Sequence, residues 1–367
     1  MNILVLAESL DPSSGWGAYA RSLVGALRTS GTTVTVLTSD NTSESLPCLP
    51  LSEAKGACRG GIRLPRFHAG GFAWSYAGFR LRRWLAGRTF DAVHVMVEPY
   101  ARLYRAFGNV PFVITVHGTY ADPAAHGRYA STFRHALERA CRIVAVSEYT
   151  RERVQPEFQE KTVAIPNGVD LGIVDEPFDP APAHGTPLVL SVGAMKARKG
   201  FDRLIAGFAE FVRSHPNAEL VIIGRDDDPS LRQRLAAQAE RFGIASRVRM
   251  LGEVSRPALL GWYRACDVFA LTPVTDGGFE GFGLVFLEAN AFGKPCVGSR
   301  DSGARDAIID GVTGVLVDAT SSTDVARGLG RALTLTRERI QSETTLVTWG
   351  MRAKEYQSAY RTCQPVA

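Results

Sequence analysis

The chain has no long apolar run. Apolar residues make up 45% of its 367 residues, yet no stretch approaches the ~20 consecutive apolar residues of a membrane-spanning helix. The amino terminus carries no basic flank, and its first apolar run ends at Ala7, so it does not resemble a secretory signal peptide. These absences predict a globular protein without a membrane span.

Cysteine is also scarce. The six cysteines show no close pairing, so the pattern predicts neither a zinc site nor a disulfide framework. Cys141, Cys266 and Cys296 fall in apolar segments, where we expect them to pack in the core. The expectation is a cytoplasmic protein in a reducing compartment.

Charge imbalance is slight overall and strong in one place. The 42 basic and 37 acidic residues give a net charge of +5, too mild to predict a nucleic-acid partner. Residues 55–88, however, contain eight Lys or Arg, six aromatic residues and no Asp or Glu. Such a stretch predicts a peripheral contact with an anionic membrane on its inner face, or a pocket for a phosphorylated acceptor. A solvated basic helix with core aromatics is the alternative.

Apolar runs of strand length alternate with helical patterns along the whole chain. This alternation predicts parallel sheets with helices on both faces. Six runs lie on each side of a proline-rich stretch, so we expect two similar α/β domains of the Rossmann-like, doubly wound kind. The runs are 3–7, 33–38, 92–97, 112–116, 142–146 and 162–165, then 188–192, 219–223, 247–251, 267–271, 295–298 and 315–317.

The domain boundaries follow from composition. We expect an amino-terminal domain over 1–172, a linker over 173–187 and a carboxyl-terminal domain over 188–345. The final segment, 346–367, reads as an amphipathic helix.

A short apolar helix is expected over 284–292. Gly293 lies just past its end and Pro295 beyond, as is typical of a helix stop. Because the helix is apolar nearly all round, we expect it to be buried.

Two carboxylates flank the start of this helix. Glu280 precedes it, Glu288 lies within it, and Gly281 and Gly283 open the backbone between them. Free N–H groups at a helix start can seat a phosphate, and a buried carboxylate can accept hydrogen bonds from a ribose diol. The arrangement is what a nucleotide-sugar site needs. Surface exposure of Glu280 and pairing of Glu288 with an arginine are the alternative.

This segment resembles the retaining glycosyltransferases of family 4, which have the GT-B fold of two Rossmann-like domains facing across a cleft. Glu280 and Glu288 match that family's two glutamates with seven residues between them. The loop of the family is matched by Gly281, Phe282, Gly283 and Leu284. The resemblance implies a UDP- or GDP-sugar donor, a hydroxyl acceptor that is lipid-linked or phosphorylated, and neither a metal nor a cofactor. It also implies that Glu280 lies by the donor sugar and Glu288 by the ribose.

The resemblance extends to other segments. His117, just past a strand, matches a histidine near the donor sugar, and Lys199 matches a lysine that holds the diphosphate. Where the family often has an arginine the chain has Ala194, so Arg198 or Lys196 would take its place. The base pocket would include Val254. The closing segment 346–367 would cross back onto the first domain.

Gly15 and Gly17 allow two interpretations. The resemblance places a donor-binding glycine loop here. Together with Asp40 they also fit an NAD-type oxidoreductase, although seven residues separate Ala7 from Gly15 where that fingerprint wants a tight turn. A non-catalytic module that binds sugar nucleotides or membranes is a third hypothesis.

The acidic run Asp226–Asp228 invites a metal interpretation, which we reject. Asp228 is expected to cap the helix that follows, with Pro229 in its first turn.

Overall fold

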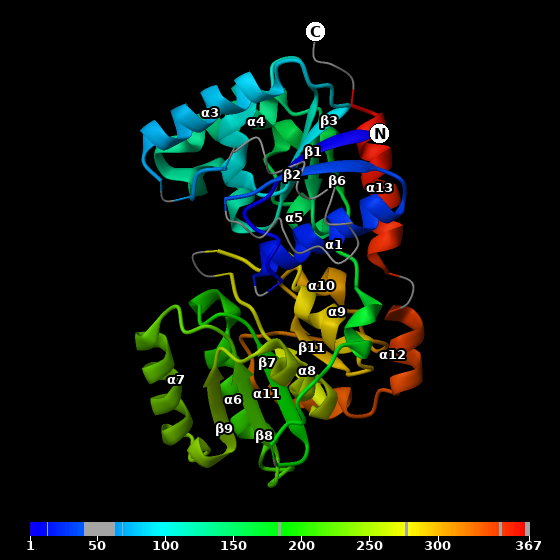
Figure 1. The fold of residues 1–367 in the computed structure, drawn as a ribbon. Coiled ribbons are helices and arrows are strands. Elements are labelled where there is room, and N and C mark those ends of the chain that lie inside the picture. Colours follow the sequence, from blue (N-terminus) through cyan, green and yellow to red (C-terminus); the bar gives the residue numbers. More distant parts are fainter. Residues whose placement is uncertain are drawn as a thin grey trace. The chain divides into compact units, whose positions relative to one another are not determined.

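The computed structural model describes residues 1–12, 14–39, 63–67, 69–182, 185–275, 278–344 and 347–363. Asp40 and the first part of the basic stretch 55–88 therefore lie outside the described residues. The chain forms two compact units, one of Met1–Asn167 with Trp349–Ala367 and one of Gly168–Thr348 (Figure 1).

The first unit is built on a parallel sheet of six strands in the order β2-β1-β3-β4-β5-β6. Its central strands β3 and β4 are mainly apolar and buried along their length, because helices cover both faces of a parallel sheet. The strands are β1 (Asn2–Leu6), β2 (Thr33–Leu37), β3 (Ala92–Val95), β4 (Phe112–Val116), β5 (Arg142–Ala145) and β6 (Thr162–Ala164). The helices are α1 (Gly15–Thr29), α3 (Gly71–Leu85), η2 (Glu98–Ala106), η3 (Thr119–Ala121), η4 (Pro123–Tyr129), α4 (Ala130–Arg139), α5 (Glu148–Arg151), η5 (Pro156–Lys161) and α13 (Trp349–Arg361).

The second unit repeats this plan, with a parallel sheet in the order β12-β11-β10-β7-β8-β9. Its strands are β7 (Leu188–Val192), β8 (Glu219–Ile223), β9 (Val248–Gly252), β10 (Val268–Leu271), β11 (Cys296–Ser299) and β12 (Gly314–Val317). Its helices are η6 (Leu171–Asp175), η7 (Ala197–Lys199), α6 (Phe201–Phe211), α7 (Pro229–Arg241), η8 (Ala245–Arg247), α8 (Arg256–Ala265), α9 (Leu284–Ala291), α10 (Ala304–Ala307), α11 (Ser322–Ala332) and α12 (Arg337–Thr344).

All twelve expected strands are present, and the expectation of two doubly wound α/β sheets is confirmed. Expected and observed strand ends differ by at most two residues. The largest difference is at β3, which ends at Val95 because the chain turns into η2 at Glu98.

The proline-rich stretch is packed rather than free. The N–H of Asp179 donates to the carbonyl of Pro257 at the start of α8, at 3.0 Å. A Cβ at Gly261 of α8 would lie 1.8 Å from the carbonyl oxygen of Asp179, so only glycine allows this approach. The expected linker 173–187 therefore belongs to the second unit.

Helix α13, the last of the chain, belongs to the first unit and runs beside α1 (Figure 1). Buried hydroxyl groups connect it to the sheet. The hydroxyl of Tyr356 lies 2.7 Å from that of Tyr19 on α1, and the hydroxyl of Tyr360 lies 2.8 Å from Nδ1 of His94 on β3. Nε2 of His94 lies 2.8 Å from the hydroxyl of Thr115 on β4. A chain of satisfied polar groups thus fixes one orientation of the helix.

A disulfide also ties the end of the chain to the first unit, which corrects the expectation of no disulfide. Cys141 pairs with Cys363, with their Cα atoms 5.3 Å apart and a sequence separation of 222 residues. Disulfides persist in oxidising compartments, so this pair does not support the expected reducing environment. Cys266 and Cys296 are free and buried, as expected.

Two further expectations concern what is absent. Within the described part of the chain, no helix has both the length and the apolar character needed to cross a membrane. Across those same residues, no group of three or more His, Cys, Asp or Glu side chains is placed to hold a metal ion.

Asp228 caps α7 as predicted, accepting from the N–H of Leu231 at 3.1 Å.

Candidate functional site

The second unit brings three of the predicted site residues together. Glu280 accepts hydrogen bonds from Lys199 and Arg198, and the distance from Lys199 Nζ to Glu280 Oε2 is 2.8 Å. Lys199 and Glu280 are both nearly buried, with side chains 12% and 11% exposed, and Arg198 is 31% exposed. Two cations and one carboxylate thus form a compact cluster where the loops after β7 and β10 meet.

Glycine allows these two loops to approach. Gly200 follows Lys199 with φ +67°, and a Cβ there would lie 1.9 Å from the carbonyl oxygen of Thr272. The Thr272 hydroxyl donates to the carbonyl of Gly200 at 3.0 Å, and the N–H of Val274 donates to that of Arg198 at 3.0 Å. The backbone beside both cations is therefore held from the neighbouring strand's loop.

The electrostatics of the cluster follow from burial and pairing. Burial alone would raise the pKa of Glu280, but the charges of Lys199 and Arg198 lower it to about 2. Burial lowers the pKa of Lys199, and Glu280 opposes that shift. The carboxylate therefore stays ionised and acts as a fixed negative partner for the two cations.

The helix start beside Glu280 is closely packed. Gly283 has φ +87°, and a Cβ there would lie 2.7 Å from the ring of Phe286. The N–H of Gly303, after β11, donates to the carbonyl of Glu280 at 2.9 Å, and a Cβ at Gly303 would lie 2.1 Å from the carbonyl oxygen of Gly281. Gly281 and Phe282 are buried in this turn. Helix α9 then runs from Leu284 and ends before Gly293, confirming the predicted apolar helix and its stop.

Glu288 lies within α9, whereas Glu280 precedes the helix. Its Oε2 accepts from the hydroxyl of Tyr263 at 2.8 Å. Burial raises the pKa of Glu288, while Tyr263 and the more distant charge of Arg256 lower it. Arg256 itself pairs with Glu176 at 2.5 Å. Among the described residues, no arginine forms an ion pair with Glu288, and Glu288 keeps acceptor capacity beyond one hydroxyl.

Two more predicted residues of this unit are Lys196 and Val254. Lys196 pairs with Asp227 at 3.5 Å and is 48% exposed, so Arg198 rather than Lys196 stands with Lys199 where Ala194 supplies no cation. Val254 lies partly exposed between β9 and α8.

In the first unit, His117 is fixed by two contacts just past the end of β4. Its ring Nε2 lies 2.7 Å from the carbonyl oxygen of Met96, which makes Nε2 the protonated nitrogen. Its backbone N–H donates to Oε1 of Glu98 at 2.5 Å. Burial lowers the pKa of His117 to about 4, so the ring is neutral near pH 7 and Nδ1 is left as an acceptor.

Aromatic rings surround His117. The ring of Tyr19 meets it edge-on, with centroids 4.6 Å apart, and that of Trp16 lies 6.3 Å away. Tyr120 lies 5.9 Å from Trp16. An imidazole in such surroundings has few orientations open to it.

Gly15 and Gly17 do not form the expected open loop. They are the first residues of α1, and Ser14 caps this helix by accepting from the N–H of Gly17 at 3.0 Å. A Cβ at Gly17 would lie 2.0 Å from the carbonyl oxygen of Asp11, so packing alone requires glycine there. At Gly15 a Cβ would meet nothing within 4 Å, and this position remains open to a ligand.

Sequence reasoning missed Glu98, Tyr19 and Tyr263. Glu98 carried a usable signal, since it is an acidic residue placed at once after a buried strand, where parallel sheets bind ligands. Tyr19 and Tyr263 gave no such signal, because a tyrosine in an apolar helix is usually interpreted as a core residue.

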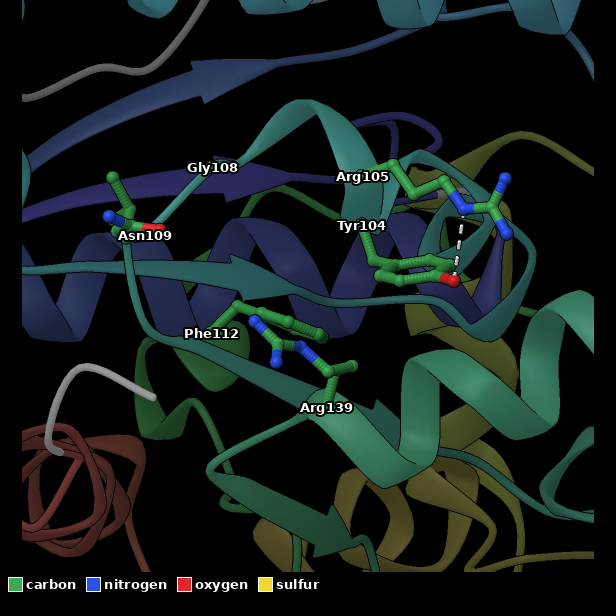
Figure 2. Close-up of a pocket in the computed structure, with 7 residues that line it drawn as sticks. Tyr104, Arg105, Gly108, Asn109, Phe112 and Arg139 are labelled. Atoms are coloured by element: carbon green, nitrogen blue, oxygen red, sulfur yellow. Dashed lines mark hydrogen bonds between the residues drawn. The ribbon is translucent and has the colours of Figure 1, made fainter. Parts of the chain in front are cut away.

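A separate pocket of about 210 Å³ lies at the opposite end of β4, beginning at Phe112 (Figure 2). Arg105 and Arg139 enter it from η2 and α4, and Nε of Arg105 donates to the hydroxyl of Tyr104 at 3.1 Å. Its lining also includes Gly108, Asn109 and Val110, and contains none of the predicted site residues.

Known proteins resemble this chain along its length. A phosphatidyl-myo-inositol mannosyltransferase of Mycolicibacterium smegmatis is 28% identical over 338 residues, which are 89% of this chain and 83% of the relative. Among solved structures, a sucrose-phosphate synthase from Thermosynechococcus elongatus has a TM-score of 0.73 at 22% identity, over 98% of each chain. Anabaena HepE in complex with UDP and glucose has a TM-score of 0.71 at 18% identity, over 99% of this chain and 100% of the other. The two structures establish the GT-B fold.

Family descriptions match both units. Residues 13–172 match Glycosyltransferase Family 4, and residues 174–345 match Glycosyl transferases group 1. An oxidoreductase with its nicotinamide site at Gly15 is not supported by either match. The strand order, the Glu280 cluster and these matches agree, and the chain belongs to the glycosyltransferases of family 4.

Proposed function

We propose that the protein transfers a sugar from a UDP- or GDP-sugar to a hydroxyl acceptor, with retention of configuration and without a metal or other cofactor. The observation that carries this proposal is the pairing of Lys199 and Arg198 with one buried carboxylate, Glu280, beside a glycine-rich helix start. A buried cation pair of this kind suits a diphosphate, because guanidinium and ammonium groups both bind phosphate oxygens strongly.

The leaving group would be stabilised by these cations. As the sugar–phosphate bond breaks, negative charge grows on the diphosphate, and preformed positive charge in a nearly buried site lowers that barrier. Lys199, Arg198 and the backbone N–H groups at the start of α9 would supply this charge, a role that other transferases give to a divalent ion.

The two glutamates would have different roles. Glu280, held by the cations, would accept hydrogen bonds from hydroxyl groups of the donor sugar and orient the ring. Glu288, further along α9, would accept from the ribose hydroxyls, since Tyr263 occupies only part of its acceptor capacity. Val254 would line the base pocket, Gly15 would let the donor approach the backbone, and His117 would contact the donor sugar.

The acceptor proposal rests on the name of a relative. The relative from Mycolicibacterium smegmatis is named for transfer to phosphatidyl-myo-inositol, which is an anionic lipid. We therefore propose a lipid-linked or phosphorylated hydroxyl acceptor for this chain.

Helix α3 supports a membrane-surface version of this proposal. Phe72, Tyr76 and Phe79 are 85%, 54% and 59% exposed and, with exposed Arg83, follow one stripe of the helix. The helix contains no acidic residue, and two of its three basic residues, Arg82 and Arg83, lie in the last turn. Of its aromatic side chains only Trp74 is fully in the core, so the alternative of a solvated helix with core aromatics accounts poorly for the other rings. Exposed aromatics beside arginines fit the interface of an anionic bilayer.

Reversing Arg82 and Arg83 to Glu is expected to weaken binding to vesicles of mixed phosphatidylglycerol and phosphatidylcholine by 100-fold or more, since each basic residue near such a surface contributes ~1 kcal/mol. The double variant Arg241→Glu with Arg331→Glu is the matched control, because both residues are exposed in the last turn of a helix in the second unit. Flotation of the three proteins at low salt measures the effect. Wild-type protein that ignores the vesicles, or equal loss in the control, contradicts the membrane version.

The proposed function is tested by screening nucleotide sugars against the purified protein. A bound donor should raise the melting temperature by mass action, and that donor should then release nucleotide diphosphate when inositol lipids or other hydroxyl acceptors are added. Release should continue in EDTA. Loss of turnover in EDTA that Mn²⁺ restores would contradict metal independence. Donor binding without release under any acceptor would favour the non-catalytic module.

A further inference from the structure

The buried carboxyl group of Glu98 contacts the backbone of His117 and has no role in the reaction proposed above. Glu98 is fully buried, with 0% of its surface exposed, at the start of η2 just past β3. His117 lies just past β4, the neighbouring strand in the sheet. The two residues therefore meet at the carboxyl edge of the sheet, where open α/β sheets bind ligands.

The two oxygens of this carboxyl group differ. Oε1 accepts the N–H of His117 at 2.5 Å. Oε2 is buried and accepts no hydrogen bond from any residue in the described part of the chain. An apolar residue here would avoid the cost of burying such a group, so its presence requires a reason beyond packing.

The turn that Glu98 holds is unusual. Gly118 has φ +146°, in a region that side chains rarely adopt, and the chain enters the short helix η3 at Thr119 directly after it. Because the ring of His117 also donates to the Met96 carbonyl at 2.7 Å, backbone and side chain are fixed by groups from the same segment, 96–98.

We propose that Glu98 is a positioning residue for the transfer reaction, whose carboxylate clamps the His117–Gly118 turn and so sets how His117 meets the donor sugar. This inference rests on the proposed function in assuming that His117 contacts the donor. It adds that this contact depends on a second residue, the buried Glu98.

The clamp has a consequence for pH. Burial raises the pKa of Glu98 to about 7, against the lowering effect of the N–H groups of His117 and of Glu98 itself. An N–H bond to an ionised carboxylate is stronger than one to a neutral carboxyl group. The turn is therefore held more firmly above pH 7 than below it.

Three other titratable groups near this clamp, His94, His117 and Tyr19, keep one charge state around pH 7. Burial lowers the pKa of His94 to about 3 and that of His117 to about 4, and it raises that of Tyr19. The charged side chains on the helices packed against η2 are Arg80, Arg82 and Arg83 on α3 and Arg134, Glu138 and Arg139 on α4, and η2 itself carries Arg102 and Arg105.

Two substitutions separate the clamp from a merely structural role. Glu98→Ala removes the acceptor, and kcat should fall 10- to 100-fold, as expected for a misplaced contact group. Glu98→Gln keeps a neutral acceptor, so kcat should return to within about threefold of wild type at pH 6. The wild-type enzyme should gain activity across pH 7, and Glu98→Gln should show no such step. Nucleotide-diphosphate affinity should be unchanged in both, because the diphosphate cations lie in the other unit.

Glu138→Gln on α4, an exposed carboxyl group in the same unit, is the control and should keep the wild-type pH profile. Wild-type kcat in Glu98→Ala, or a pH step that persists in Glu98→Gln, would overturn the assignment. If Glu98→Ala does not fold by circular dichroism, the Glu98→Gln profile decides alone.

A second measurement does not depend on turnover. In protein with labelled histidine, the His117 ring signals, assigned from a His117→Gln variant, should shift near pH 7 in wild type and stay constant there in Glu98→Gln. Identical shifts in both proteins would overturn the clamp. Absence of turnover with every donor would instead contradict the proposed function and leave this measurement to decide on Glu98.

Discussion

Glu280→Gln is expected to lower kcat by about 100-fold or more, which corresponds to roughly 2.7 kcal/mol of activation free energy. The carboxylate is held by Lys199 and Arg198 and would orient the donor sugar, and misplacement of a reacting ring costs turnover rather than binding. Affinity for the bare nucleotide diphosphate should not fall, because the substitution releases both cations. Initial rates over a range of donor concentrations, with calorimetry for the diphosphate, measure both quantities.

The same variant has an effect on stability whose sign can be worked out. The pKa of Glu280 in the folded protein is about 2, below its ordinary value of 4.5. The ionised carboxylate therefore contributes stability above pH 4.5, and this contribution is lost as the pH falls through 2. Its size is about 3 kcal/mol. Wild-type protein should thus lose more stability on acidification than Glu280→Gln, as measured by denaturant unfolding at each pH. A variant with normal kcat would show that the sugar is oriented elsewhere.

Lys199→Ala is expected to lower kcat/KM by about 10²–10³ and to weaken nucleotide-diphosphate binding. Lys199 is the more deeply buried of the two cations on Glu280, and removing one preformed group from the developing charge typically costs this much. Lys196→Ala is the matched control from the same loop. Lys196 is half-exposed and pairs with Asp227, so its loss should change kcat/KM less than about threefold.

Loss of Lys199 also leaves Glu280 with one partner, which lowers stability and could imitate a catalytic defect. The double variant Lys199→Ala with Glu280→Gln removes both charges. Its melting temperature should recover toward wild type while its activity stays low. Recovery of activity together with stability would mean that Lys199 serves the fold alone.

Local pattern accounts for much of what could be predicted. Apolar runs bounded by polar turns marked all twelve strands, and glycine and proline marked the end of α9 at Gly293. Asp228 was identified as a helix cap from its place before Pro229. Each of these features depends on neighbours within a few residues, and the backbone's own hydrogen-bonding needs decide them.

Spacing is ambiguous where one pattern fits two structures. Gly15 and Gly17 fit an open loop, yet they begin a capped helix in which the nearby carbonyl of Asp11 leaves room only for glycine at position 17. Their role in donor binding stays a prediction. Cys141 read as a core residue because its neighbours are apolar, and its partner, Cys363, is 222 residues away. Neither ambiguity can be resolved from spacing.

The sequence by itself determined the two α/β sheets and the positions of Lys199 and Glu280 on their loops. Only the tertiary structure decided that these two residues, 81 apart, share one hydrogen bond, and that Glu98 supports His117 from the next strand. It also decided that Tyr356 of α13 meets Tyr19, 337 residues earlier. The reason is physical: periodicity and turn chemistry act over one element, whereas contacts between elements depend on the order in which parallel strands are placed side by side.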